Sequence, residues 1–491
     1  NLEETSMKKN FLTVAAMMAV AFFVSAEIAK AADVTFSGQI RTRWDVTEQF
    51  GGGGAAGTMA GNDQADDAVF SSVRLAAKAN VNESTSAFIQ LQSTRNWGNN
   101  DAEAAGSNGA GEGNASFTAN DNDSSVGVHQ AYMQFNNFLN LPMGWSAKIG
   151  RQEVLLDGWR LFGNTIWTPG MQAHDMVRLE HKHDNTYATL GYILAREDGR
   201  NSDPADHQDT DVWMAYLQQK GVLGGALSLY FVRSDDQAGT RNREVEINTV
   251  GFRQAGKLWG FDYRGEYYHQ FGEGAGVNHS GTQDATNVAA NTAGVDYNAY
   301  MFGLRIGRTA KNTAMKPSLT LWYDYLSGTS DEDSRNGDYK SFNTVFDTGH
   351  KYYGLIDMFL GIGGGGAGGT QGLGLQDLAI KGKIKPLAGW TLKADYHWFW
   401  TAEGLRANTV ASGVTTAQAQ DGNFLGNELD ITAVTKMNAN TKVMIGYSNF
   451  NQTNSMILVK GGSIGGANAT GANAIGGATI DWGYVQFDVK F

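Results

Sequence analysis

The sequence of 491 residues has no cysteine, only five prolines and, after residue 31, no apolar run long enough for a membrane helix. Without cysteine there is neither a disulfide framework nor a thiolate metal site. A spanning helix needs about 20 mainly apolar residues, so a helical membrane protein is excluded. Basic charge is also scarce, because 38 lysines and arginines stand against 50 acidic residues, giving a net charge of -12. This balance argues against a general nucleic-acid binder.

Enzyme signatures are missing as well. The chain has neither a Gly-x-Ser-x-Gly elbow nor a His-Glu-x-x-His zinc motif. His181 and His183 share a predicted strand face without a third ligand. Acidic residues at 121, 123 and 331–333 have the ligand type that calcium prefers, but such runs in loops are more often only solvated. We therefore expect no enzymatic activity, no cofactor and no metal site, with calcium in the acidic loops left open.

Residues 7–31 are predicted to be a secretory signal peptide. A basic pair follows the methionine, residues 11–24 form an apolar core, and small residues precede cleavage after Ala31. The core is shorter than the roughly 20 residues of a spanning helix. The mature domain is then residues 32–491. An exported chain without disulfides or membrane helices is either a soluble β protein or an outer-membrane β-barrel.

Apolar and polar residues alternate along much of the mature chain. In residues 34–46 one face carries Val34, Phe36, Ile40, Trp44 and Val46, and the other carries Thr35, Ser37, Gln39, Arg41, Arg43 and Asp45. The same period recurs in residues 261–267 and 390–398 and predicts β-strands. A soluble sandwich buries its apolar faces in a core, whereas a membrane barrel turns them to lipid. Alternation by itself leaves both folds open.

Connection lengths separate the two folds. Roughly 18 alternating segments are present, a number within the range of bacterial barrels. Connections after even-numbered segments are short, at 82–85, 184–185, 255–257, 386–388 and 438–440. Connections after odd-numbered segments are mostly long and polar, at 49–66, 98–125, 272–296, 328–372 and 403–424. This asymmetry predicts an all-β fold, a transmembrane antiparallel β-barrel of about 18 strands with short periplasmic turns and long external loops.

The final segment supports a closed barrel in the cell outer membrane. Val485, Phe487, Val489 and Phe491 share one face of it, and closure requires this last strand to pair with the first. A terminal aromatic residue also resembles the signal used by the outer-membrane assembly machinery. The glycine-rich tracts at 363–374 and 461–477 are assigned to loops.

The polar faces of such a barrel line its lumen. The pore-lining residues predicted from alternation are Arg41, Arg43, Arg74, Arg178, Arg264, Arg305, Lys393, Glu428 and Asp430. The guanidinium fork of arginine suits carboxylates and phosphates, and rings of charge in a narrow pore select ions. As a set these residues favour a path for an anionic solute. For any one arginine, an ion pair that only stiffens the wall is the better interpretation.

Three islands of sequence resemble the alginate-export outer-membrane channel family. They are 150–153 with 158–163, Trp167 and 175–178; 346–357; and 426–430 with 446–448. The resemblance implies a monomeric barrel of 18 strands, narrowed by inward loops, whose arginine-rich constriction passes an acidic polysaccharide outward. Matched residue by residue, it assigns Arg151, Arg160, Asp175 and Arg178 to the constriction. His350, Tyr353 and Asp357 match the second island, for which we expect a role in ordering a loop.

Two features of residues 149–179 depend on the local fold. If the loop between the two strands folds inward, Trp159 and Arg160 reach the lumen. Alternation from Ile149 points Arg151 outward, unless a bulge re-aims it or its side chain snorkels at the rim. Arg178 does not depend on that choice.

The sequence thus predicts a porin for passive passage of an anionic solute, with export of an acidic polysaccharide such as alginate as one form. The alternative is a general or nutrient-uptake porin with no polysaccharide role. Expected partners are the lipid bilayer of the outer membrane and an anionic small molecule or acidic polysaccharide. We expect a monomer that does not bind nucleic acid.

Overall fold

The computed structural model describes ten ranges of the chain: residues 33–50, 64–97, 126–196, 209–237, 245–275, 294–360, 369–370, 372–405, 422–459 and 479–491. The predicted signal peptide, residues 7–31, lies outside these ranges. So do the acidic residues 121 and 123 and the glycine-rich tract 461–477, together with most of the tract 363–374.

The described ranges form one sheet of nineteen strands. One of them, β14 (Asp338–Tyr339), is a two-residue addition that runs parallel to β12. The other eighteen are antiparallel to their neighbours: β1 Asp33–Phe50, β2 Gln64–Asn80, β3 Thr85–Asn96, β4 Gly127–Phe135, β5 Ser146–Gln152, β6 His174–His183, β7 Thr186–Arg196, β8 Thr210–Val222, β9 Gly225–Asp236, β10 Val245–Leu258, β11 Phe261–Ala275, β12 Gly294–Thr309, β13 Ser318–Leu326, β15 Leu375–Ile384, β16 Trp390–Trp400, β17 Phe424–Lys436, β18 Thr441–Gln452 and β19 Thr479–Lys490.

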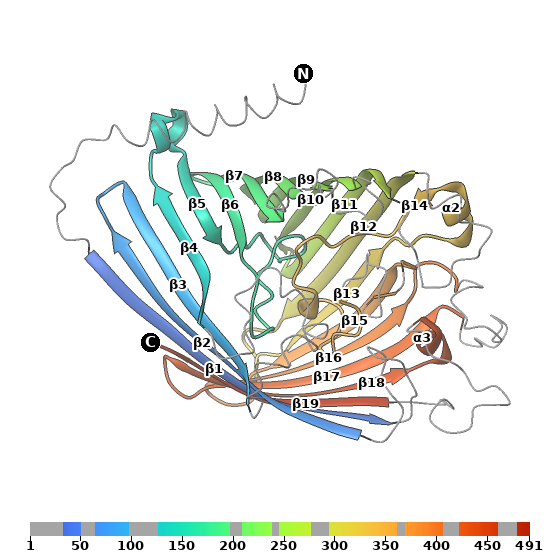
Figure 1. The fold of residues 1–491 in the computed structure, drawn as a ribbon. Coiled ribbons are helices and arrows are strands. Elements are labelled where there is room, and N and C mark those ends of the chain that lie inside the picture. The colour runs from blue at the N-terminus through green and yellow to red at the C-terminus, as the bar shows by residue number, and fades with distance from the viewer. Residues whose placement is uncertain are drawn as a thin grey trace.

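Strand β1 pairs with both β2 and β19, which closes the sheet into a barrel (Figure 1). The transmembrane antiparallel β-barrel of about 18 strands is therefore confirmed. Beyond the last paired strand, Phe491 exchanges two backbone hydrogen bonds with Gly38, at 2.7 and 3.1 Å. A Cβ atom at Gly38 would stand 2.3 Å from the Phe491 ring. Glycine thus makes room for the terminal aromatic residue at the closing seam.

The two faces of each strand differ in polarity as alternation predicts. In β1, Phe36, Ile40 and Trp44 are exposed on the outer surface, whereas Arg41 and Asp45 are buried on the inner face. Apolar groups outside lie against lipid, and the polar groups inside line or fill the lumen. The same assignment holds in β19, where Phe487 and Val489 face outward and Tyr484, Gln486 and Asp488 face inward.

Short turns join the strands at one end of the barrel, as predicted for the periplasmic side. One predicted turn is wrong, because residues 255–257 belong to β10 and pair with β11. The turn is instead Trp259–Gly260, where both residues have positive φ, 51° and 81°. A two-residue hairpin turn needs such backbone angles, so it forms where glycine supplies one of them cheaply.

The remaining elements are short. They are the 3-10 helices η2 (Phe138–Asn140), η3 (Pro142–Gly144) and η6 (Gly349–Lys351) and the α-helices α2 (Asp331–Asn336) and α3 (Asn454–Val459). Among the described residues, no helix is both long and apolar enough to cross a membrane. In the acidic run 331–333, Asp333 is paired with Lys340 at 2.6 Å.

Candidate functional site

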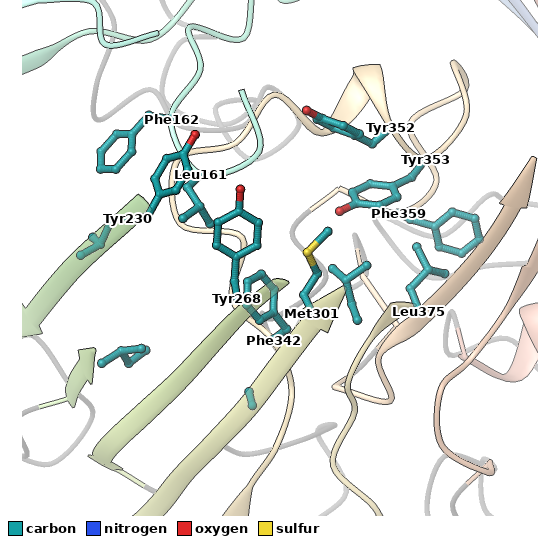
Figure 2. Close-up of a cluster of buried hydrophobic side chains, with 14 of the residues drawn as sticks. Leu161, Phe162, Tyr230, Tyr268, Met301, Phe342, Tyr352, Tyr353, Phe359 and Leu375 are labelled. Carbon is teal, nitrogen blue, oxygen red and sulfur yellow. The ribbon is translucent and has the colours of Figure 1, made fainter. Parts of the chain in front are cut away.

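The connection between β5 and β6, residues 153–173, folds into the barrel. In Figure 1 it is the teal segment that leaves the wall after β5 and passes through the interior. Its apolar side chains pack in one cluster with wall residues such as Tyr230 of β9 and Tyr268 of β11 (Figure 2). The residues that this connection contributes to the cluster are Val154, Leu156, Leu161 and Phe162, each at most 3% exposed. This connection, called the crossing loop below, is a packed part of the lumen, so the condition that it folds inward, left open by the sequence, is met.

A second segment, residues 340–360 between β14 and β15, lies against the crossing loop inside the barrel; we call it the plug segment. Phe346 accepts a backbone hydrogen bond from Gly163 at 2.8 Å and donates one to Leu161 at 3.0 Å. Figure 2 shows Tyr352 and Tyr353 of the plug segment beside the same buried cluster. The two segments therefore support each other, and neither is a free external loop.

Arg160 fastens the crossing loop to one wall. Its guanidinium contacts Asp324 of β13 at 2.5 Å and Glu266 of β11 at 3.0 Å, and it donates a hydrogen bond to the Tyr353 hydroxyl at 2.8 Å. Its central carbon lies 3.6 Å from the ring centre of Tyr352. Arg160 is only 2% exposed. Arg160 thus lies inside the lumen, but because two carboxylates surround it, it presents no free charge to a passing solute.

Arginines on the opposite wall hold the other end of the crossing loop. Arg41 of β1 donates hydrogen bonds to the carbonyls of Ile166 and Thr168, the latter at 2.6 Å. Arg43 donates to the Trp167 carbonyl at 2.9 Å and lies 4.1 Å from the centre of the Trp167 ring. Strands β1 and β11 are about half the barrel apart in the strand order. The loop therefore spans the lumen from wall to wall.

The ring of Trp167 also connects the crossing loop to the plug segment. It stacks on His350 with 4.2 Å between ring centres and only 6° between the planes. His350 in turn contacts Asp357 at 2.8 Å within the plug segment. We propose that the second sequence island orders this loop. The contacts of its residues His350, Tyr353 and Asp357 support that role.

Other arginines predicted to line the pore are inward but already in contact with neighbours. Arg74 donates to Gln92 at 2.7 Å. Arg264 lies 3.4 Å from Glu266 and 3.5 Å from Asp324, in the cluster that holds Arg160. Arg178 lies 3.3 Å from Glu180. Arg305 is half-buried and lies 5.3 Å from the centre of the Trp322 ring.

The predicted acidic residues Glu428 and Asp430 are inward and buried in β17. Glu428 accepts backbone hydrogen bonds from Leu355 and Ile356 of the plug segment, at 2.6 and 2.9 Å. Asp430 accepts one from the Ser448 hydroxyl at 2.5 Å. These carboxylates hold structure, so they are not open to a solute in this conformation.

The register of β5 and β6 corrects the prediction for Arg151 and Asp175. The two are cross-strand partners, joined by an ion pair of 2.8 Å. Asp175 shares its face of β6 with the exposed Val177, whereas Arg178 is buried on the inner face. The register continues through Gly150 without a bulge in these described strands. Arg151 and Asp175 therefore lie on the outer face of the wall and do not line the pore.

Near the short turns, the inner wall carries lysines in two groups. One group lies on β15, β16 and β18, where Lys383 and Lys393 are cross-strand partners and both are exposed. Lys381 lies 3.4 Å from Asp395, and Lys442 lies 3.7 Å from Asp488. The other group comprises Lys78 of β2, Lys148 of β5 and Lys182 of β6. We call these seven residues the vestibule lysines.

The vestibule lysines outnumber the acids near them. Within the described part of the chain, Lys78, Lys148, Lys182, Lys383 and Lys393 form no ion pair with a carboxylate. Lys148 and Lys182 instead lie over the rings of Tyr132 and Tyr187, at 4.6 and 5.2 Å. Face assignment from the sequence identified Lys393 here, but only the fold shows that Lys148 and Lys442 join the same inner surface.

Lys351 of the plug segment is a functional candidate that was not among the residues predicted from the sequence. It is exposed, donates to the Gly158 carbonyl at 3.0 Å and lies 4.3 Å from the centre of the Trp159 ring. Although the residue as a whole is exposed, the lumen partly desolvates its ammonium group. This desolvation, followed by the neighbouring charges of Arg264 and Arg305, lowers the pKa of Lys351 to about 8. The fold thus places a titratable cation beside aromatic rings in the lumen.

Comparison with known proteins gives one family and several similar structures. The family model described as alginate export matches residues 33–457. A search of curated sequences gave no match. The chain is similar to Pseudomonas aeruginosa OccK9 (OpdG), with 11% identity, a TM-score of 0.51 and coverage of 94% of this chain and 99% of that one. For Acinetobacter baumannii OccAB1 these values are 14%, 0.50, 94% and 99%, and for OccAB4 of the same organism 10%, 0.50, 95% and 100%. At such identities the likeness concerns the fold alone.

Proposed function

This chain belongs to the alginate-export family, and on that premise we propose that this outer-membrane channel passes anionic solutes, among them an acidic polysaccharide such as alginate. The observation that carries the proposal is the group of vestibule lysines at the end of the barrel with short turns. A net charge of -12 over the whole chain makes this local excess of cations notable.

The position of these cations supports an effect on ion selection. A ring of like charge in a confined, partly desolvated pore attracts counter-ions and repels ions of its own sign. Lys383 and Lys393 face each other, and the nearby Asp395 pairs with Lys381, so part of their positive field remains uncancelled. A mobile anion near them replaces the missing counter-charge. Because the short turns are periplasmic, this end of the lumen meets solutes that come from the periplasm.

The middle of the lumen supports the choice of an acidic sugar over a simple anion. Lys351 offers an ammonium group 4.3 Å from the centre of the half-buried Trp159 ring, whereas the rings of Trp322 and Tyr352 near Arg305 and Lys351 are buried. Aromatic rings suit the apolar faces of sugar rings, and cations suit carboxylates. A uronate unit offers both features. We further propose that the channel acts passively, as a monomer and without catalysis, since the wall needs only a hydrated path and a selective field.

Block of single-channel current by sugar oligomers in planar bilayers tests the proposal. Oligouronates added on the periplasmic side should interrupt the current at concentrations where neutral oligosaccharides of equal length do not. The neutral sugars are the matched control for size. Equal block by both, or no block by either, would favour the alternative of a general or nutrient-uptake porin with no polysaccharide role.

A further inference from the structure

The anchor of the plug segment on β17 contains more carboxyl groups than cations. Glu428 is 0% exposed and holds the backbone of residues 355 and 356, and Asp430, two residues further on the same inner face, is 2% exposed. Burying one carboxylate already costs several kcal/mol unless it is paired. Two neighbouring carboxylates in one buried site repel each other as well, and such pairs retain a proton.

The atoms that would share that proton can be named. Asp430 uses Oδ1 to accept from Ser448, and Glu428 uses Oε1 to accept from both backbone amides. Glu428 Oε2 and Asp430 Oδ2 have no hydrogen-bond donor among the described residues. The two side chains leave the same buried inner face of β17 two residues apart, so their carboxyl groups are neighbours. Two carboxyl oxygens can form a hydrogen bond only when one of them carries a proton.

The histidine beside this pair does not supply the missing positive charge. Nδ1 of His397 contacts Asp377 at 2.8 Å, and Nε2 contacts the Lys381 ammonium at 3.0 Å. An ammonium group only donates, so Nε2 accepts and Nδ1 carries the hydrogen that Asp377 accepts. Both ring nitrogens of His397 are therefore engaged by Asp377 and Lys381, and Nε2 stays 4.0 Å from Asp430 Oδ2. Lys381 is the cation at this place in the wall, and it also lies 3.4 Å from Asp395.

Charged or titratable groups lie beside the pair on the neighbouring strands. On β16 they are Asp395 and His397, the cross-strand partners of Asp430 and Glu428; on β15, Asp377 and Lys381, which contact His397, with Asp324 of β13 beyond Asp377; and on β19, Tyr484. Asp324 is already neutralised by Arg160 and Arg264. Lys381 is thus the nearby cation for Asp377, Asp395, Glu428 and Asp430 together. Because positive charge is scarce here, retaining one proton is the most favourable way to neutralise the Glu428–Asp430 pair.

We propose that Glu428 and Asp430 share one proton and that this protonated pair is a latch for the plug segment. With the proton in place, Glu428 Oε1 holds the amides of Leu355 and Ile356 while Oε2 and Asp430 Oδ2 bind each other. When alkali removes the proton, two buried anions repel, and Glu428 moves away from its bonds to the plug segment. The plug segment then loosens and the channel conducts more. The latch requires that the chain is a channel but not that it prefers anions.

The plug backbone leaves no space for Glu428 to rearrange while the latch is closed. Gly354, just before the two amides, has φ of +86°, and a Cβ atom there would stand 2.3 Å from Glu428 Oε2. A side chain at this position would be strained and would also displace the carboxyl group. The substitution Gly354→Ala therefore opens the latch without changing a titratable residue. It is a useful counterpart to variants of the pair itself.

Single-channel conductance between pH 5 and pH 9, in high salt to screen surface charge, tests the latch. Wild-type conductance should rise severalfold at the alkaline end. Glu428→Gln should keep the low value at every pH, because its amide oxygen still accepts from the plug while its NH2 group donates to Asp430. Gly354→Ala should conduct at the high level throughout. Wild-type conductance that does not change with pH would overturn the latch.

Two further measurements keep the test independent of folding and of ion preference. Infrared difference spectra of wild type and Glu428→Gln at pH 6 should show a protonated carboxyl band that the variant lacks; its absence in wild type would also overturn the latch. If Asp377→Asn removes the band and the pH response while Glu428→Gln does not, the proton belongs to Asp377 and the latch is wrong. Reversal potentials report ion preference separately, so failure of the proposed function leaves these results unaffected.

Discussion

In the middle of the lumen, Arg160 is 2% exposed and contacts two carboxylates, whereas at the periplasmic mouth Lys393 is exposed and faces another lysine, Lys383. Both residues belong to the inner charge pattern that alternation and family resemblance identify. Their surroundings differ, and so does the role of each positive charge. Arg160 uses its charge to hold the crossing loop against the wall, and Lys393 leaves its charge available to ions.

The difference between Arg160 and Lys393 shows that a cation in the barrel lumen contributes to ion selectivity only when no neighbouring carboxylate neutralises it. A buried arginine with matched carboxylates contributes almost no field beyond its own cluster. An exposed lysine without a nearby acid contributes a field that reaches roughly 8 Å at physiological salt, the Debye length. Selectivity is therefore expected to depend on the vestibule lysines, and stability on the arginine clamps.

Removal of the Arg160 clamp should have the largest effect on the folded state. Arg160→Met leaves Glu266 and Asp324 buried with only Arg264 and the more distant Arg253 as counter-charges. Breaking a buried pair from one side costs about 3–5 kcal/mol. We expect a clear drop in the unfolding midpoint in detergent, measured by intrinsic fluorescence. Arg305→Met removes a half-buried arginine that lies over Trp322 and has no ion pair among the described residues, so it is the matched control and should lower the midpoint far less. Equal drops of the unfolding midpoint in the two variants would contradict the claim that an arginine buried between carboxylates stabilises the fold more than an unpaired one.

Neutralising three vestibule lysines should change ion preference with little effect on stability. In the triple variant Lys383→Gln, Lys393→Gln and Lys442→Gln, the ratio of anion to cation permeability should fall severalfold, because three positive charges, two of them without an ion pair among the described residues, are lost from the mouth. Reversal potential in a salt gradient measures this ratio. A variant with unchanged reversal potential and a lowered unfolding midpoint would show that these lysines only stabilise the wall.

Raising the pH should give the smallest change, through Lys351. Its pKa of about 8 lies below the ordinary lysine value, so its charge is present at pH 7 and is mostly lost by pH 9. Anion preference should therefore decline modestly over this range. Lys351→Arg keeps its charge and should remove the decline. Because the Glu428 latch acts on conductance, the comparison is made on reversal potential. A decline that persists in Lys351→Arg would assign it to another group.

Much of the fold follows from residue order along the chain. Alternation in β1 and β19 and the unequal connections are local patterns, and they predicted the barrel, its orientation and its closure. Local patterns also placed Arg41, Arg264 and Glu428 inside. The turn at Trp259–Gly260 was missed because the period-two pattern continues through residues 255–257, and only the two positive φ angles mark where the chain reverses.

The candidate site was less predictable because its partners are far apart in sequence. Arg160 meets Glu266 and Asp324, which are 106 and 164 residues away. No local pattern encodes such contacts, so free and neutralised arginines look alike in the sequence. Family resemblance put Arg151 in the constriction, whereas strict alternation pointed it outward, and the register with Asp175 decides for alternation. Lys351 could be found only after the plug segment was seen to fold inward.

The reversal potential of the wild-type channel at pH 7, in a potassium chloride gradient across a planar bilayer, tests the central claim most directly. A preference for chloride is predicted, since the vestibule lysines leave a positive field at the periplasmic mouth. A reversal potential at zero or on the potassium side would contradict the account.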